Sequence, residues 1–254
     1  MPRTAIITGA SSGIGKAFVK ALLESSDCPD KIWIVARRID RLNEMAQLSD
    51  KLVPVQADLL VAEGIDVIKA KLQSENPDVT LLINCAGMGK KGKIADRDAS
   101  DIADTVTLNC TALSVLTREV IPFMNRGARI INVGSSAAYL PQPGFTVYAA
   151  SKSYVVSFSR ALAIELKSRG ISVTVVCPGP VETEFNKLAT DGKSSEFTGF
   201  RKFVAADADK LAAASLKAAK HGRRMFVYGL PNKALHVGAK FIPVGLFLEL
   251  FYRG

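Results

Sequence analysis

The sequence predicts a doubly wound α/β fold, in which one sheet of about seven parallel strands carries helices on both faces. Short, nearly continuous apolar runs alternate with longer segments of helical periodicity, and such runs are typical of strands that are buried on both faces. No repeat, low-complexity stretch or linker interrupts the chain. We therefore expect residues 1–254 to form a single domain.

The strands and helices are expected to alternate along the whole chain. Strands are predicted at residues 4–8, 31–36, 51–57, 79–84, 128–134 and 171–177, and a seventh around Val227. Helices are predicted near residues 13–25, 38–48, 63–75, 99–124, 148–169 and 207–220. This alternation indicates βαβ units with right-handed crossovers.

One long segment, about residues 184–206, lacks either pattern. Loops of this length in compact domains are often functional lids, so we expect a substrate lid here. The segment is mostly polar, yet it carries an apolar set that a permanently solvated loop would not need: Phe185, Leu188, Phe197, Phe200 and Phe203.

The composition narrows the classes of function. The net charge of +9 fits either solvated basic faces or an anionic partner. Lys and Arg do not interleave with aromatic residues in any run, so we expect no nucleic-acid partner. The four cysteines lack metal-ligand or redox spacing, which predicts no metal site and free thiols in a cytoplasmic protein. We expect neither a signal peptide nor a transmembrane span.

A glycine cluster marks the expected nucleotide site. The segment Thr8-Gly9-Ala10-Ser11-Ser12-Gly13-Ile14-Gly15 follows the first strand and opens the first helix. Glycine lets the backbone approach a pyrophosphate, and a helix N-terminus offers free N–H groups to an anion. This context predicts dinucleotide binding.

The end of the second strand indicates which dinucleotide is bound. An acidic residue there would hold the ribose 2′-hydroxyl of NAD. This chain instead has Arg37 and Arg38, and a guanidinium binds a 2′-phosphate through charge-assisted hydrogen bonds. The pair therefore predicts NADP as the cofactor, with Lys16 as a further source of positive charge.

Four polar residues form the candidate catalytic group. Tyr148 and Lys152 are four positions apart and so share one helix face, where an ammonium is expected to lower the pKa of the phenol. Ser135 follows the fifth strand, at the sheet edge where α/β enzymes bind ligands. Asn109 lies in the fourth predicted helix, where its amide could hold a helix carbonyl or a water.

Together these motifs resemble the classical short-chain dehydrogenase/reductase family. The resemblance extends from Thr4 to about Thr183 and includes Asp58, the Asn-Cys-Ala-Gly segment at 84–87 and the Pro-Gly-Pro-Val-Glu-Thr segment at 178–183. Two positions depart from the family pattern. Cys85 replaces a usual asparagine, and Gly134 stands where serine is common, which leaves Ser136 as an alternative to Ser135.

The resemblance implies a Rossmann-type fold and a role for each matching residue. Asn109, Ser135, Tyr148 and Lys152 would be the catalytic tetrad, with Asn109 holding a water of the proton relay. Lys152 would also bind the nicotinamide ribose. The remaining cofactor contacts would come from Gly9, Ser11, Ser12, Gly13, Ile14, Asp58, Leu59, Asn84, Gly87, Pro178, Val181 and Thr183.

The expected activity is hydride transfer between NADP(H) and a carbonyl/alcohol pair, on a bulky hydrophobic substrate. A non-catalytic NADP(H)-binding regulator on the same fold and an epimerase or dehydratase are the alternatives. The resemblance also implies a homodimer or homotetramer, with the fourth and fifth predicted helices paired across the interface.

The C-terminal segment, about residues 230–254, is apolar between Phe241 and Phe251 but is interrupted by Pro243 and Glu249. Three interpretations remain open: a core or subunit-interface element, a wall of an apolar substrate pocket, or a peripheral membrane contact. Under the second, this segment would meet the lid over the active site.

Overall fold

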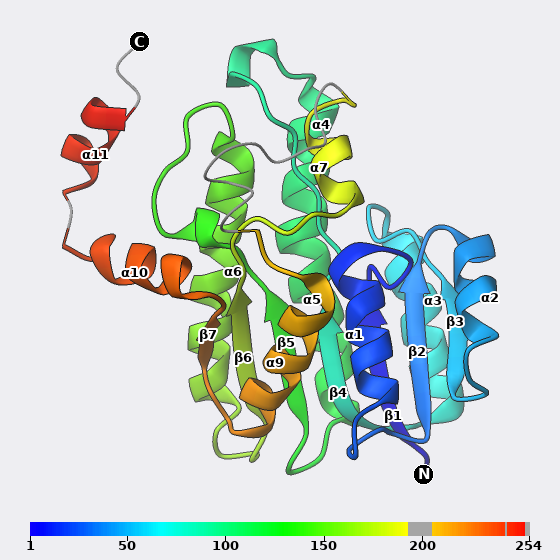
Figure 1. Ribbon diagram of the computed structural model, residues 1–254. Helices are drawn as coiled ribbons and strands as arrows, with labels where there is room; N and C mark the ends of the chain where they lie inside the picture. The colour runs from blue at the N-terminus through cyan, green and yellow to red at the C-terminus, as the bar shows by residue number, and fades with distance from the viewer. Residues whose placement is uncertain (193–204, 242, 252–254) are drawn as a thin grey trace.

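The computed structural model describes residues 1–192, 205–241 and 243–251 of the chain. It contains one sheet of seven parallel strands in the order β3-β2-β1-β4-β5-β6-β7 (Figure 1). The strands are β1 (Arg3–Thr8), β2 (Lys31–Ala36), β3 (Leu52–Gln56), β4 (Asp78–Asn84), β5 (Arg129–Val133), β6 (Ser172–Cys177) and β7 (Met225–Val227). All seven predicted strands are confirmed.

The strands form because their apolar side chains are covered on both faces. One face packs on α1 (Gly13–Leu23), α2 (Ile39–Ala46) and α9 (Ala208–Lys220). The other packs on α3 (Ala62–Glu75), α5 (Leu113–Val120) and α6 (Thr146–Glu165). Alternate residues of each strand feed the two layers: Ile7 joins the first and Ile6 the second. This is the predicted doubly wound arrangement.

The predicted helix at 99–124 is not continuous. It consists of α4 (Ala99–Val106), a π-helical turn at Thr107–Ala112, α5, and a 3-10 turn at Ile121–Phe123. The π turn contains Asn109, whose side chain is buried and bonded outside the helix. Single π turns inside α-helices often occur at functional sites.

The lid segment begins as a helix instead of an irregular loop, with α7 at Glu184–Ala189. Of the apolar lid residues, Phe197, Phe200 and Phe203 lie outside the described residues. Short 3-10 turns occur at Ile94–Asp96 and Ser136–Ala138.

The C-terminal segment forms α10 (Leu230–Gly238) and α11 (Val244–Phe251). Asn232 anchors α10, because its side chain is buried and donates a hydrogen bond to the Tyr228 carbonyl at 3.0 Å. The ring of His236 packs on that of Tyr139. Figure 1 shows α10 and α11, in orange and red, extending away from α7. Among the described helices, none is long and apolar enough to cross a membrane.

The strand order reverses between β1 and β4, because β2 and β3 continue on one side of β1 and β4 to β7 on the other. In such sheets the carboxyl ends of the strands diverge at this point and leave a crevice. The fold therefore places the loops after β1, β4, β5 and β6 around one site.

Candidate active site

A cleft of about 460 Å³ opens at the carboxyl ends of the strands. The loops after β1, β2, β4, β5 and β6 line it, together with α7. Most of the predicted site residues contribute to its wall: Gly9, Ser11, Ser12, Gly13, Ile14, Arg37, Arg38, Asp58, Leu59, Gly87, Ser135, Tyr148, Lys152, Pro178, Val181 and Thr183.

Two predicted residues, Asn84 and Asn109, do not line the cleft. Asn84 is buried, and its amide donates to the Thr117 hydroxyl and to Oδ1 of Asn132, each at 2.9 Å. Its side chain therefore joins β4 to β5 and α5 beneath the site. The role of Asn84 in the ribose region of the cofactor site stays a prediction.

The glycine motif forms a cradle in which side chains would not fit. A Cβ on Gly15 would overlap the Gly9 carbonyl oxygen, and a Cβ on Gly9 would lie 2.9 Å from the Ala86 backbone. The Thr8 hydroxyl oxygen accepts hydrogen bonds from the N–H groups of Cys85 and Ala86 at 3.0 and 3.1 Å. Thr8 thus fixes the loop after β4 against the loop after β1. The cradle and the start of α1 at Gly13 fit the pyrophosphate of a dinucleotide.

Arginines and carboxylates meet at the far end of this cradle. Arg38 donates to the hydroxyls of Ser11 and Ser12 at 3.2 and 3.1 Å, and to Glu184 of α7 at 3.1 Å. Arg41 binds the other oxygen of the same carboxylate at 2.6 Å. Arg37 lies 3.9 Å from Asp58. The guanidiniums predicted to favour a phosphate therefore do face the adenosine end of the site.

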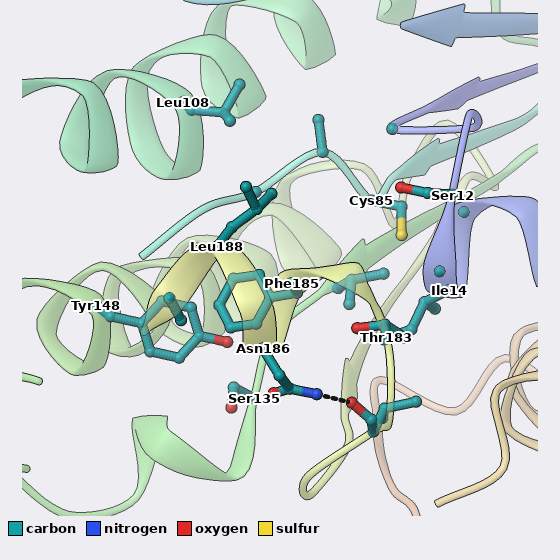
Figure 2. Close-up of a pocket in the computed structure, with 18 of the residues that line it drawn as sticks. Ser12, Ile14, Cys85, Leu108, Ser135, Tyr148, Thr183, Phe185, Asn186 and Leu188 are labelled. Atoms are coloured by element: carbon teal, nitrogen blue, oxygen red, sulfur yellow. Dashed lines mark hydrogen bonds between the residues drawn. The ribbon is translucent and has the colours of Figure 1, made fainter. Parts of the chain in front are cut away.

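Tyr148 lies at the opposite end, in the first turn of α6, between two aromatic rings. It stacks on Phe145 with a centroid distance of 4.3 Å, and Phe185 of α7 approaches at 5.3 Å. Figure 2 shows the phenol and the Phe185 ring side by side, with Ser135 below them. A Cβ on Gly89 would lie only 2.5 Å from the Tyr148 ring. Close packing thus fixes the position of the phenol.

The structure resolves which serine faces the phenol. The Ser135 side chain is close enough to the phenol to lower the pKa of Tyr148, and its Oγ accepts a hydrogen bond from the Ala137 N–H at 3.1 Å. Ser135 is the N-cap of the 3-10 turn at Ser136–Ala138, which sets its orientation. Ser135, and not Ser136, is therefore the partner of Tyr148.

The expected lowering of the Tyr148 pKa is not seen. Burial raises the pKa of Tyr148 to about 12, and the hydrogen bond from Ser135 only partly opposes this rise. Lys152 directs its ammonium elsewhere, since Nζ donates to the Val133 carbonyl at 2.9 Å and lies 5.7 Å from the phenol ring centroid. In this geometry Tyr148 holds its proton at neutral pH and can act as a proton donor.

Lys152 is itself buried. Burial lowers its pKa, an effect opposed by the nearby thiols of Cys85, Cys110 and Cys177. A buried ammonium with a lowered pKa is easily deprotonated and reprotonated. Lys152 is therefore suited to pass protons and not merely to anchor a ligand.

Asn109 supports Lys152 from behind the cleft wall. Its Oδ1 accepts from the Met88 N–H at 2.9 Å, and its Nδ2 donates to the Met88 carbonyl at 2.8 Å and to Ser151 Oγ at 2.9 Å. A Cβ on Gly87 would lie 3.1 Å from Asn109 Oδ1 and 3.3 Å from Lys152 Nζ. These bonds use both N–H donors of the Asn109 side chain, whereas its Oδ1 can accept one further hydrogen bond.

The cysteine that departs from the family pattern lines the cleft without being reactive. Burial raises the pKa of the Cys85 thiol to about 12, and only the thiolate is a strong nucleophile. Burial likewise raises the pKa of Cys177 to about 11. Among the described residues no group of His, Cys, Asp and Glu could hold a metal ion.

Several residues of the site escaped the sequence analysis. Gly89 and Phe145 fix the phenol, Gln142 lines the cleft, and Arg41 and Glu184 complete the charged end. Phe145 stands three positions before Tyr148, one helical turn away, which was a usable signal. Glu184 gave none, because its arginine partners are 143 and 146 residues away.

Among the described residues, the C-terminal segment contributes nothing to the cleft that the lid helix lines. Phe185 and Leu188 of α7 do line the cleft, but its described lining ends at Ala189 and includes no residue of α10 or α11. The helix α10 packs instead near β7 and the turn at Ser136–Ala138. Their place in the fold does not support a pocket wall in the same chain.

Comparisons with known proteins agree with this geometry. A family model for short chain dehydrogenases matches residues 3–194. The NADP-dependent 3-hydroxy acid dehydrogenase of Schizosaccharomyces pombe is 33% identical over 199 residues, which cover 75% of this chain and 76% of the relative.

Solved structures match over nearly the whole chain. A short-chain dehydrogenase from Sphingobium yanoikuyae in complex with NADPH has 29% identity and a TM-score of 0.75, over 99% of this chain and 98% of that one. The 3-ketoacyl-(acyl-carrier-protein) reductase from Brucella melitensis complexed with NADH has 25% identity and a TM-score of 0.75, over 89% and 96%. Similar structures thus contain either nicotinamide dinucleotide.

Proposed function

Because this chain belongs to the short-chain dehydrogenase/reductase family, whose members are oxidoreductases, we propose that it reduces a bulky hydrophobic ketone or aldehyde with NADPH, or oxidises the matching alcohol. The observation that carries the proposal is the placement of Ser135, Tyr148 and Lys152 in one cleft with the phosphate cradle. A non-catalytic regulator would not need this combination, and the relatives' names do not favour an epimerase or dehydratase.

The chemistry follows from the proton that Tyr148 carries. When bound, the nicotinamide would supply the hydride that reaches the carbonyl carbon. Ser135 would donate a hydrogen bond to the carbonyl oxygen and hold it beside the phenol. Tyr148 would give its proton to that oxygen as negative charge develops there.

Lys152 would return a proton to Tyr148 after each turnover. Its side chain lies on the same face of α6 and its pKa is lowered by burial, so it exchanges protons more readily than an exposed lysine. Asn109 would position this lysine by holding the Met88 segment and Ser151. In the oxidative direction the same groups would act in reverse.

The adenosine end supports NADP(H) over NAD(H). Arg38 presents its guanidinium beside Ser11 and Ser12, Arg37 also lines the cleft, and Arg41 lies behind Arg38 on the shared carboxylate of Glu184. A 2′-phosphate would gain charge-assisted hydrogen bonds from them, whereas a 2′-hydroxyl would gain much less.

The substrate end supports an apolar carbonyl compound. Phe145, Phe185, Leu188 and Leu108 line the cleft near Tyr148, and Figure 2 shows Phe185 and Leu188 entering from α7. We propose that residues 184–206 act as the lid. When the lid excludes water, the hydrogen bonds from Ser135 and Tyr148 to the developing alkoxide become stronger.

The outer helices support an oligomer. The described faces of α4, α5 and α6 expose Val106, Val115, Tyr154 and Ile164, and an exposed apolar set on neighbouring helices is typical of a subunit interface. We propose a homodimer or homotetramer formed through this face. All four cysteines are free, as is usual for a cytoplasmic enzyme.

A substrate screen tests this function directly. The purified chain is mixed with NADPH or NADH and a panel of bulky hydrophobic ketones and small polar ones, and nicotinamide oxidation is followed by absorbance. The expected result is turnover that favours NADPH and the bulky ketones. Equal kcat/KM for small sugars would contradict the substrate class, and turnover with NADH alone would contradict the cofactor.

A further inference from the structure

Glu184 of the lid helix lies between Arg38, which lines the cleft, and Arg41, which lies behind the cleft wall. One carboxylate oxygen lies 3.1 Å from Nη1 of Arg38 and the other lies 2.6 Å from Nη1 of Arg41. Hydrogen bonds from both arginines hold the pKa of Glu184 below its usual range. An ionised carboxylate therefore bridges two guanidiniums that belong to α2 and the loop before it.

Three of the five N–H donors of Arg38 are engaged in this arrangement. Its Nη1 is taken by Glu184, and its Nη2 by the hydroxyls of Ser11 and Ser12. A phosphate bound bidentately to the Nη edge of Arg38 would take the Nη1 side that Glu184 now occupies. Glu184 and a 2′-phosphate are thus alternative partners of Arg38.

The charge balance favours replacement of Glu184 by the phosphate over binding of both anions to the same arginines. The ion pairs at this end join three arginines, Arg37, Arg38 and Arg41, to two carboxylates, Asp58 and Glu184. A phosphate carries between one and two negative charges near neutral pH and repels a carboxylate that remains in place. Departure of Glu184 would leave three positive charges for the phosphate and Asp58.

Displacement of Glu184 would also affect the Tyr148 end of the cleft, because Glu184 begins the short helix α7 that lies against Tyr148. Thr183 and Phe185 flank Glu184 and line the cleft, and Phe185 packs against Tyr148. The far end of α7 is held separately, where Asp191 pairs with Lys90 and Arg97. The helix is therefore fastened at two ends, and the phosphate acts on one of them.

We propose that Glu184 is a specificity-determining residue that competes with the 2′-phosphate for Arg38 and Arg41, so that NADP(H), but not NAD(H), releases the first turn of the lid helix. The inference rests on the proposed NADP(H) function and adds Arg41 and Glu184 to its phosphate site. It also gives the lid a means of sensing which cofactor is bound.

Three variants of the full-length chain separate competition from other effects. Glu184→Gln removes the competing charge. Glu182→Gln is the charge-matched control. It removes one negative charge two positions earlier, from an exposed carboxylate that has no ion pair among the described residues. Asp191→Asn loosens the opposite end of α7 without touching the arginines.

Dissociation constants for NADPH and NADH are measured for each variant by titration. Glu184→Gln is expected to lower the dissociation constant for NADPH roughly 3- to 10-fold, because two half-exposed ion pairs no longer compete with the phosphate. The dissociation constant for NADH should change by less than about 2-fold, because NADH has no 2′-phosphate to compete. Glu182→Gln and Asp191→Asn should leave the ratio of the two constants unchanged. Weaker or unaltered NADPH binding by Glu184→Gln would overturn the proposal.

Hydrogen exchange supplies a second readout at the amides of residues 184–189. In the wild type, the exchange rate of these amides should be higher with saturating NADP⁺ than with saturating NAD⁺. Glu184→Gln should abolish this difference. Equal exchange in the wild type would contradict release of the lid. If the wild type bound NADPH and NADH equally and Arg38→Gln did not change the NADPH dissociation constant, the proposed cofactor itself would be wrong.

Discussion

Replacing Gly89 with alanine should displace the phenol of Tyr148 without altering the cofactor site. A Cβ at this position would lie 2.5 Å from Cδ2, 2.9 Å from Cγ and 3.0 Å from Cβ of Tyr148. The first distance is about 0.9 Å shorter than the 3.4 Å at which ordinary contact begins. Either Tyr148 or the loop after β4 must move by an amount of that order.

The ring has little room in which to move. Phe145 stacks on it at 4.3 Å and Phe185 lies at 5.3 Å. A misplacement of about 1 Å in a reacting group can lower the rate by up to roughly 100-fold. We therefore expect Gly89→Ala to reduce kcat for ketone reduction by about 10- to 100-fold, while the dissociation constant for NADPH stays close to that of the wild type.

Steady-state kinetics with the best ketone and NADPH titration measure the two quantities. Gly245→Ala is a suitable control, because an added Cβ there meets no atom within 4 Å. Circular dichroism should confirm that both variants are folded. If folded Gly89→Ala turned over ketone at the wild-type rate, the close packing of Tyr148 would not be what positions the phenol.

Three further results follow from the site and the surface. Arg38→Gln should weaken NADPH binding by about 10-fold, which is the low end for a charge-assisted contact because the side chain is half exposed. NADH binding should stay unchanged, and an equal loss of affinity for both cofactors would contradict a phosphate contact. The pKa of Tyr148 is raised to about 12, so the proton needed for reduction remains in place until strongly alkaline pH. Ketone reduction should therefore be independent of pH through neutrality and alcohol oxidation should increase with pH, and a reduction rate that already falls at neutral pH would refute this protonation state. Light scattering should show a dimer or tetramer that Ile164→Asp dissociates, whereas a wild type that is monomeric at micromolar concentration would argue against the exposed face of α6 as an interface.

The sequence predicted the sheet and most of the cleft because these depend on local patterns. Each buried strand is a continuous apolar run, and the glycine motif needs close backbone approaches that are visible in the residue types. Tyr148 and Lys152 were found because four positions place two side chains on one helix face. Ser135 was located by its place after a strand.

The features that the sequence missed depend on contacts between distant segments. The pKa of Tyr148 could not be anticipated from Lys152 alone, because burial raises this pKa and the ammonium donates instead to the Val133 carbonyl. The π turn around Asn109 reflects bonds to Met88 and Ser151 that helical periodicity does not encode. The hydrogen bonds by which Asn84 joins β4 to β5 and α5 also connect residues far apart in the sequence.

The central claim is that Tyr148 donates the proton to the carbonyl oxygen, and Tyr148→Phe tests it most directly. The substitution removes the hydroxyl and keeps the ring that packs between Phe145 and Phe185, so NADPH affinity and folding should be retained. Single-turnover reduction of the best ketone, followed by NADPH absorbance, should slow by roughly 10²- to 10⁴-fold, as expected for loss of a general acid. If a folded, NADPH-bound Tyr148→Phe protein reduced the ketone at the wild-type single-turnover rate, Tyr148 would not be the proton donor.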